Sequence, residues 1–116
     1  MKILLLLTCL FISFSSFSAH NCKGKVANID IAGGGNLQAN IAGIGDGNVF
    51  CNIKTKLGEY EPEACSAVLS IFMAAKMADK NIRVYFRNDA NTDCNKGNWG
   101  SLADPNHGIY YVRLED

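Results

Sequence analysis

The chain lacks several features that would assign it to a functional class. It has no excess of charge of either sign, because 11 basic residues stand against 11 acidic ones. A nucleic-acid-binding protein needs a basic face that displaces counterions from phosphate, so this balance argues against nucleic acid as a partner. After residue 19, no apolar run approaches the ~20 residues of a membrane helix. We therefore expect no membrane span in the rest of the chain.

Residues that commonly carry catalysis or bind metals are also scarce. The only histidines are His20 and His107. His107 lies near Asp104 and such a pair can orient a general base, but no activated nucleophile stands in a recognisable context. No two cysteines have the Cys-x-x-Cys spacing of a zinc site. We predict no enzyme, no metal site and no cofactor, and treat a small hydrolase using His107 as an outlying alternative.

The one long hydrophobic run is N-terminal. Lys2 precedes the apolar segment 3–14, and mostly small residues follow at 15–19. This order is typical of a secretory signal peptide, and the run is too short and wrongly flanked for a membrane span. We expect residues 1–19 to be a signal peptide and residues 20–116 to form one domain, secreted or periplasmic after cleavage near residue 19. Losing Lys2 brings the net charge to about −1.

A secreted or periplasmic protein is in an oxidising environment, in which cysteines can form disulfides. Cys9 leaves with the signal peptide, and the other four become disulfide candidates. Four cysteines allow three pairings, and the sequence alone does not choose among them. The predicted elements give a hint, because Cys51 faces inward on a strand and Cys65 lies on the buried face of a helix. We prefer Cys51–Cys65, which leaves Cys22 to pair with Cys94.

Apolar and polar residues alternate in five segments, which predicts five strands. These are residues 26–31, 37–41, 49–54, 82–87 and 109–114. Between the third and the fourth, residues 62–78 have helical spacing, with Pro62 at the first position. A loop of roughly twenty residues, 88–108, is long enough to be either functional or tied down.

The order of three strands, one helix and two strands indicates a mainly β fold with one helix. A five-stranded Greek-key barrel of the OB type has this order, with the helix plugging the barrel between the third and fourth strands. The alternative is an α+β fold in which one helix covers an antiparallel sheet. Both folds bury one face of each strand against the helix, as the periodicity requires.

The outward residues of the last two strands form the candidate binding site. The fourth strand contributes Arg83, Tyr85 and Arg87, and the fifth contributes Ile109, Tyr111 and Arg113. If these strands pair, their tyrosines and arginines share one outer face, and Trp99 of the long loop can join them. We predict ligand binding by Tyr85, Arg87, Trp99, Tyr111 and Arg113.

This composition suits more than one ligand. Aromatic rings stack on the apolar faces of sugars, and guanidinium groups bind carboxylates in bidentate fashion. An outward face of aromatic residues and arginine also suits a protein interface. The third interpretation is a cross-strand ladder that simply covers a sheet.

Three pieces of residues 49–87 carry a family resemblance. They are the aromatic–cysteine strand 49–53 followed by Ala64-Cys65, the apolar helix 68–76, and the basic, apolar and aromatic strand 81–86. This block resembles the C-terminal half of the pertussis-like toxin binding subunits, including that of subtilase cytotoxin. The resemblance implies an OB fold, a Cys51–Cys65 bridge, a ring of five copies and binding of host surface glycan beside a toxin A subunit. No sugar-binding motif of those subunits is matched in the first half of the chain, so no glycan specificity carries over.

We therefore predict a secreted, non-enzymatic binding module that is similar to a toxin receptor-binding subunit and recognises glycan. The alternative is a periplasmic or secreted protein-interaction domain, such as an inhibitor or an accessory subunit.

Overall fold

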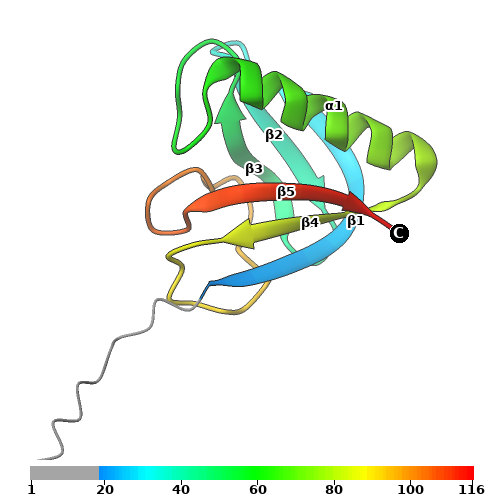
Figure 1. The fold of residues 1–116 in the computed structure, drawn as a ribbon, viewed down its shortest axis with the longest axis vertical. Coiled ribbons are helices and arrows are strands. Elements are labelled where there is room, and N and C mark those ends of the chain that lie inside the picture. The colour runs from blue at the N-terminus through cyan, green and yellow to red at the C-terminus, as the bar shows by residue number, and fades with distance from the viewer. Residues whose placement is uncertain (1–18) are drawn as a thin grey trace, which may run out of the picture.

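A computed structural model describes residues 19–116 (Figure 1). Cys9 and all but the last residue of the predicted signal peptide lie outside the described residues. The structure has five strands and one helix in the predicted order, which confirms a mainly β fold with one helix. The elements are β1 (His20–Ile31), β2 (Asn36–Ile41), β3 (Gly45–Asn52), α1 (Pro62–Ala78), β4 (Asn81–Phe86) and β5 (Ile109–Glu115). Within residues 19–116, no helix is long and apolar enough to cross a membrane.

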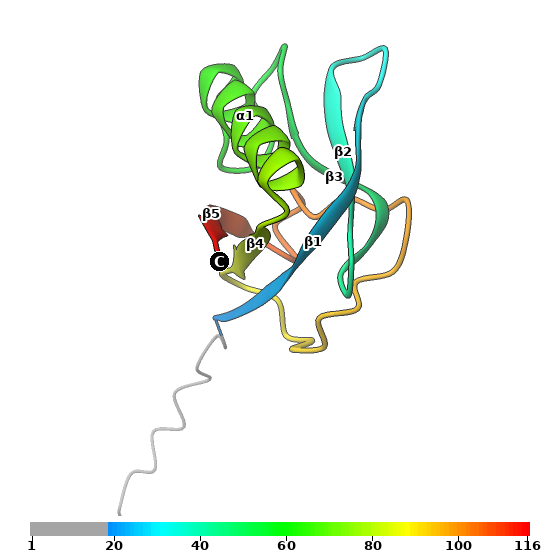
Figure 2. The ribbon, with the colours of Figure 1, turned by 90° about the vertical axis from the view of Figure 1, so that its right-hand side faces the viewer.

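All five strands belong to one antiparallel sheet in the order β3-β2-β1-β4-β5. β1 is the central strand, and Figure 2 shows it running diagonally between the β2–β3 pair and the β4–β5 pair. Its residues 20–25 pair with β4, and its residues 26–31 pair with β2. β1 therefore begins at His20 rather than at residue 26, because pairing with the distant β4 extends the strand beyond the segment of clear alternation.

The sheet has β3 and β5 as its two edge strands. Residues 100–102 of the long loop run parallel to β3 and cover part of its edge. The Val49 N–H donates to the Gly100 carbonyl (2.9 Å), and the Leu102 N–H donates to the Val49 carbonyl (2.8 Å). The antiparallel sheet with one helix is thus confirmed, whereas closure into a barrel of the OB type stays a prediction.

Helix α1 packs against the sheet with one apolar stripe. Its buried residues, Cys65, Val68, Phe72 and Ala75, follow helical spacing. Phe72 meets Phe50 of β3 edge to face, with ring centroids 5.0 Å apart. The helix begins at Pro62 as predicted and ends at Ala78. The left-handed backbone of the next residue, Asp79 (φ 55°), turns the chain into β4. The helix thereby fixes the core side of the sheet and leaves the opposite side of β4 and β5 to solvent.

Two disulfides confirm the preferred pairing. Cys51–Cys65 joins β3 to the first turn of α1, and Cys22–Cys94 joins β1 to the long loop between β4 and β5. Residues 88–108 contain no helix or strand beyond one isolated bridge. The long loop is therefore tied down at Cys94, one of the two outcomes that its length predicts.

Candidate functional site

The outward tyrosines of β4 and β5 meet across the two strands. The register pairs Tyr85 with Tyr111 and Arg83 with Arg113. The rings of Tyr85 and Tyr111 lie edge to face, with centroids 5.1 Å apart. The predicted pairing of the fourth and fifth strands is thus confirmed, and it brings aromatic and basic side chains onto one face.

A β-bulge adds a third tyrosine to this face. Between the pairs Phe86–Ile109 and Tyr85–Tyr111, β5 holds one extra residue, Tyr110. The shift turns Ile109 into the core, where it is 2% exposed, so the prediction that Ile109 faces outward with Tyr111 is wrong. The ring of Tyr110 lies 6.3 Å from that of Tyr85. Strict alternation predicts Tyr110 and Tyr111 on opposite faces of the sheet. The sequence therefore shows no sign of the bulge beyond the presence of two successive tyrosines.

Two half-exposed arginines flank the tyrosines. The guanidinium carbon of Arg87 lies 4.3 Å from the ring centroid of Tyr110, a cation–π contact, and Arg87 Nε lies 3.4 Å from Glu59 Oε1. The pKa of Arg113 is raised, first by a hydrogen bond with Tyr85 and further by the nearby Glu115 carboxylate. Arg87 Nη2 also donates to Glu59 Oε2 (3.4 Å), and the side chains of Arg87 and Arg113 are 53% and 57% exposed. We call Tyr85, Arg87, Tyr110, Tyr111 and Arg113 the tyrosine–arginine surface.

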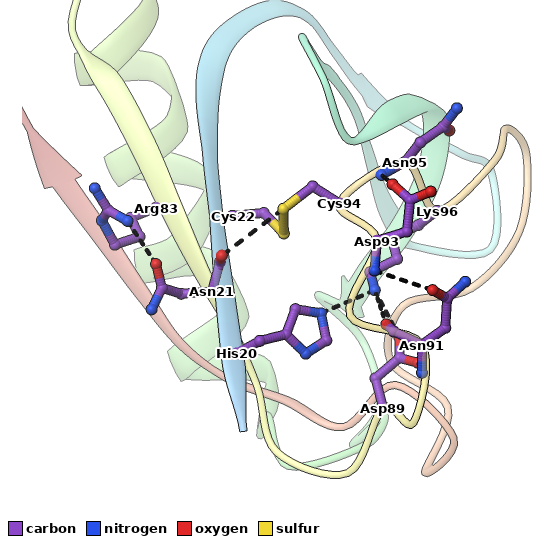
Figure 3. The surroundings of a disulfide bond; sticks show 10 residues. All are labelled: His20, Asn21, Cys22, Arg83, Asp89, Asn91, Asp93, Cys94, Asn95 and Lys96. Atoms are coloured by element: carbon purple, nitrogen blue, oxygen red, sulfur yellow. Dashed lines mark hydrogen bonds and ion pairs between the residues drawn. A yellow bond between two sulfur atoms is a disulfide. The ribbon is translucent and has the colours of Figure 1, made fainter. Parts of the chain in front are cut away.

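Arg83 stands on the same side but is occupied by the sheet itself. Its Nη2 lies 2.6 Å from Glu115 Oε1, and its Nη1 donates to Asn21 of β1 (Figure 3). Hydrogen bonding with Arg83 is the main reason why the pKa of Glu115 is lowered. Arg83 thus links β1, β4 and β5 and has little capacity left for a ligand.

Trp99 lies elsewhere. Its backbone N–H donates to the Asp46 carbonyl at the start of β3 (2.8 Å), and its indole ring covers Gly47. These contacts tie Trp99 to one edge strand of the sheet, whereas Tyr111 belongs to the other edge strand. We therefore leave Trp99 out of the tyrosine–arginine surface.

A pocket of about 250 Å³ opens beside Arg87. Ala103, Pro105 and Ile109 give it apolar walls. Glu59, Arg87 and Asn88 line it with polar groups. The pocket extends the tyrosine–arginine surface with a hollow of mixed character, although its volume is slightly below the usual range for ligand sites.

The second notable cluster is buried where β1, the end of β4 and the long loop meet. The Asp89 carboxylate lies 3.0 Å from Lys96 Nζ, and the two side chains are 6% and 1% exposed. Lys96 Nζ also lies 2.9 Å from His20 Nε2 and donates to the Asn91 carbonyl (2.7 Å). The ring of His20 stacks on Phe86 (4.9 Å between centroids). Figure 3 shows this cluster next to the Cys22–Cys94 bridge.

The same cluster holds the histidine for which a catalytic role was considered. His107 Nδ1 lies 2.5 Å from Asp89 Oδ2, so its carboxylate partner is Asp89 rather than Asp104. Asp104 contacts His107 only through the backbone, by accepting from the His107 N–H (3.0 Å). Within residues 19–116, no serine or threonine hydrogen-bonds to His20 or His107, and no group of three or more potential ligands could hold a metal ion. The contacts among His20, Asp89, Lys96 and His107 hold the long loop on the sheet, and we call these four residues the charged clasp.

The clasp predicts a loss of stability in acid. Burial alone would raise the pKa of Asp89, but hydrogen bonds from His107, Lys96 and the Asn91 N–H outweigh burial and hold this pKa below its usual range. The carboxylate therefore stabilises the fold fully above its unfolded pKa of ~3.9, and this contribution disappears as the pH falls through the lower folded value. Urea unfolding between about pH 5 and pH 2 should show a declining midpoint.

The variant Asp89→Asn isolates this contribution, because Glu115 and Asp116 also have lowered pKa values. We expect the midpoint to fall less steeply with acid in this variant than in the natural chain. Identical slopes would show that Asp89 does not contribute to the acid sensitivity.

Comparisons of this chain with protein-family models, curated proteins and solved structures find no match. The resemblance of residues 49–87 to pertussis-like toxin binding subunits therefore stays a prediction. What the site can do follows from its own geometry: three contacting tyrosines and two half-exposed guanidinium groups form a surface that is equipped for recognition.

Proposed function

We propose that this protein is a secreted, non-enzymatic binding module that recognises glycans carrying a carboxylate through the tyrosine–arginine surface. One observation carries the proposal. The ring of Tyr85 contacts those of Tyr110 and Tyr111, and the half-exposed guanidinium groups of Arg87 and Arg113 flank these rings.

The chemistry of these groups supports such a ligand. The C–H faces of a pyranose ring are apolar and stack on an aromatic ring, while its hydroxyls need hydrogen-bond partners. A guanidinium group binds a carboxylate through two parallel N–H donors. Arg113 is 57% exposed and lies 3.8 Å from Glu115, which itself is committed to Arg83. Arg113 thus has donors free for an acidic sugar next to the Tyr85 and Tyr111 rings.

The rings are also positioned before any ligand arrives. Tyr85 and Tyr111 are paired by the β4–β5 register, and the bulge fixes Tyr110 beside them. Aromatic side chains on paired strands lose little conformational freedom on binding, which favours affinity. The pocket beside Arg87 offers a hollow for a substituent of the sugar.

Replacing both cross-strand rings tests this proposal. Tyr85→Ala with Tyr111→Ala should abolish binding of sialylated glycans on an array of sialylated and neutral sugars, because the stacking surface for the acidic sugar is lost. The far-UV circular dichroism should stay unchanged, since neither ring belongs to the core.

The matched control is Tyr85→Phe with Tyr111→Phe, which keeps the rings and should retain most of the binding. Unchanged binding by the alanine variant would show that this surface does not bind the glycan. Absence of binding by the natural chain to every sugar would remove the carbohydrate function.

A specific feature favours a protein partner as the second candidate function. An apolar groove of about 250 Å³ runs between α1 and β5 and adjoins the tyrosine–arginine surface. Its helix side is lined by Ala64, Val68 and Ile71, and its strand side by Tyr110, Tyr111 and Val112. β5 is an edge strand whose outer backbone groups can pair with another chain. The mass in solution separates the candidates: five copies favour the toxin-like binding module, and a stable monomer favours an accessory or inhibitor domain.

A further inference from the structure

Trp99 is the single tryptophan of the chain, and 69% of it is exposed. Its backbone has a φ of 58°, the left-handed region that side chains other than glycine adopt rarely and at a cost. The core does not need this ring. A strained backbone that displays a large apolar ring to solvent is a feature that folding alone does not explain.

The segment around Trp99 is held rigidly on β3. The buried side chain of Asn48 donates to the Gly97 carbonyl (2.8 Å) and accepts from the Gly100 N–H (2.9 Å). The Asp46 N–H donates to Asn98 Oδ1 (2.9 Å), next to the bond from the Trp99 N–H to the Asp46 carbonyl. These bonds hold the indole in place before a ligand binds, which lowers the entropic cost of binding.

Gly47 forms the floor beneath the ring. A Cβ at this position would lie 2.2 Å from Trp99 Cε3, so the benzo ring rests directly on the glycine backbone. The residues around it in sequence, 95–98, Gly100 and 45–46, are all small or polar, and the side chain of Lys96 among them is buried. The other exposed large apolar side chains lie on β1, α1 and β5.

An isolated indole with polar neighbours points to a small ligand. The hot spots of protein interfaces are usually surrounded by further contacts that exclude water. Among the described residues, no other exposed large apolar side chain lies on β3 or on the loop of Trp99. One pyranose ring, by contrast, is matched in size by one indole, and its hydroxyls can bond to nearby carboxylate and amide groups.

We infer that Trp99 is the stacking platform of a second carbohydrate contact, which takes a neutral pyranose with Asp46 and Asn98 as partners for its hydroxyls. The carboxylate of Asp46 disfavours an acidic sugar here, in contrast to the tyrosine–arginine surface. The choice of a sugar as ligand rests on the proposed function. The platform itself rests on the exposure, backbone strain and rigid support of Trp99.

Because Trp99 is the single tryptophan, its fluorescence can be used to detect a ligand that binds to it. Intrinsic fluorescence should shift saturably when methyl glycosides of neutral hexoses or N-acetylhexosamines are titrated to millimolar concentration, and acrylamide quenching should decrease. Trp99→Ala should weaken binding to neutral glycans on an array by about tenfold or more, while Trp99→Phe retains part of it. Trp99→Ala should not alter the circular dichroism. Fluorescence that stays constant with every neutral sugar, or array binding by Trp99→Ala equal to that of the natural chain, would overturn the inference.

The variant with Tyr85→Ala and Tyr111→Ala separates the two proposals, since it keeps Trp99. A fluorescence response to neutral sugars that persists in this variant supports the Trp99 site. The same response together with unchanged binding of acidic glycans by this variant would remove the proposed function and leave the Trp99 site standing. If this variant loses binding to acidic glycans and Trp99 does not respond to neutral sugars, the proposed function stands and the Trp99 site is removed.

Discussion

Removing the Cys22–Cys94 bridge is expected to cost about 4 kcal/mol of the free energy of unfolding. The bridge joins residues 72 apart in sequence, so it removes much more entropy from the unfolded chain than a short loop would. A domain of this size has only about 5–15 kcal/mol to lose, and removal of a native disulfide often prevents folding at 37 °C. Urea unfolding of Cys22→Ala with Cys94→Ala, measured beside the natural chain, gives the difference.

The matched control is Cys51→Ala with Cys65→Ala. That bridge spans a separation of 14 residues, for which the same relation gives about 3 kcal/mol. The first pair should therefore be the more damaging of the two. It should also loosen the long loop, because Cys94 holds the segment that carries Lys96. A loss below about 1 kcal/mol would show that other contacts hold the loop without the bridge.

Asp89→Ala is expected to destabilise the fold by about 3–5 kcal/mol. The substitution leaves the ammonium group of Lys96 in a site where its side chain is 1% exposed, without the carboxylate that neutralises it. Removing one partner of a buried ion pair costs more than the pair itself contributes, because the remaining charge stays desolvated. The measurement is urea unfolding at pH 7, where the Asp89 carboxylate is ionised.

A double variant distinguishes this charge effect from simple loss of packing. Asp89→Leu with Lys96→Met replaces both charges by apolar groups and should lose much less stability than Asp89→Ala. Equal losses in the two variants would show that contacts other than the charge balance dominate. Both variants remove the contact of His107 with Asp89, and the double variant also removes the contact of His20 with Lys96.

The regular elements could be predicted because their signals are local. Alternating apolar residues identify strands whatever their partners, and helical spacing after Pro62 identifies α1. The preferred disulfides were predictable for a related reason: Cys51 and Cys65 lie at inward positions of neighbouring elements, which leaves Cys22 for Cys94. The start of β1 was not predictable, because residues 20–25 become a strand only by pairing with β4.

The candidate site shows the same division. The sequence indicated that Tyr85 and Tyr111 point outward, but not that a bulge adds Tyr110 and buries Ile109. A bulge depends on the local geometry of two paired strands, so the alternation of apolar and polar residues in one strand does not predict it. Likewise, Asp89 and Lys96 look like solvated loop residues in the sequence, and only the folded loop buries them together.

Composition, periodicity and the positions of the cysteines by themselves determined the number, type and order of the elements in this protein. They did so because burial of one face per element leaves a repeat in the chain itself. Only the tertiary structure decided which loop residues meet. It separated Trp99 from the tyrosines and assembled the Asp89–Lys96 pair. Such contacts join residues far apart in sequence, and their free energy arises only when the whole fold removes them from water.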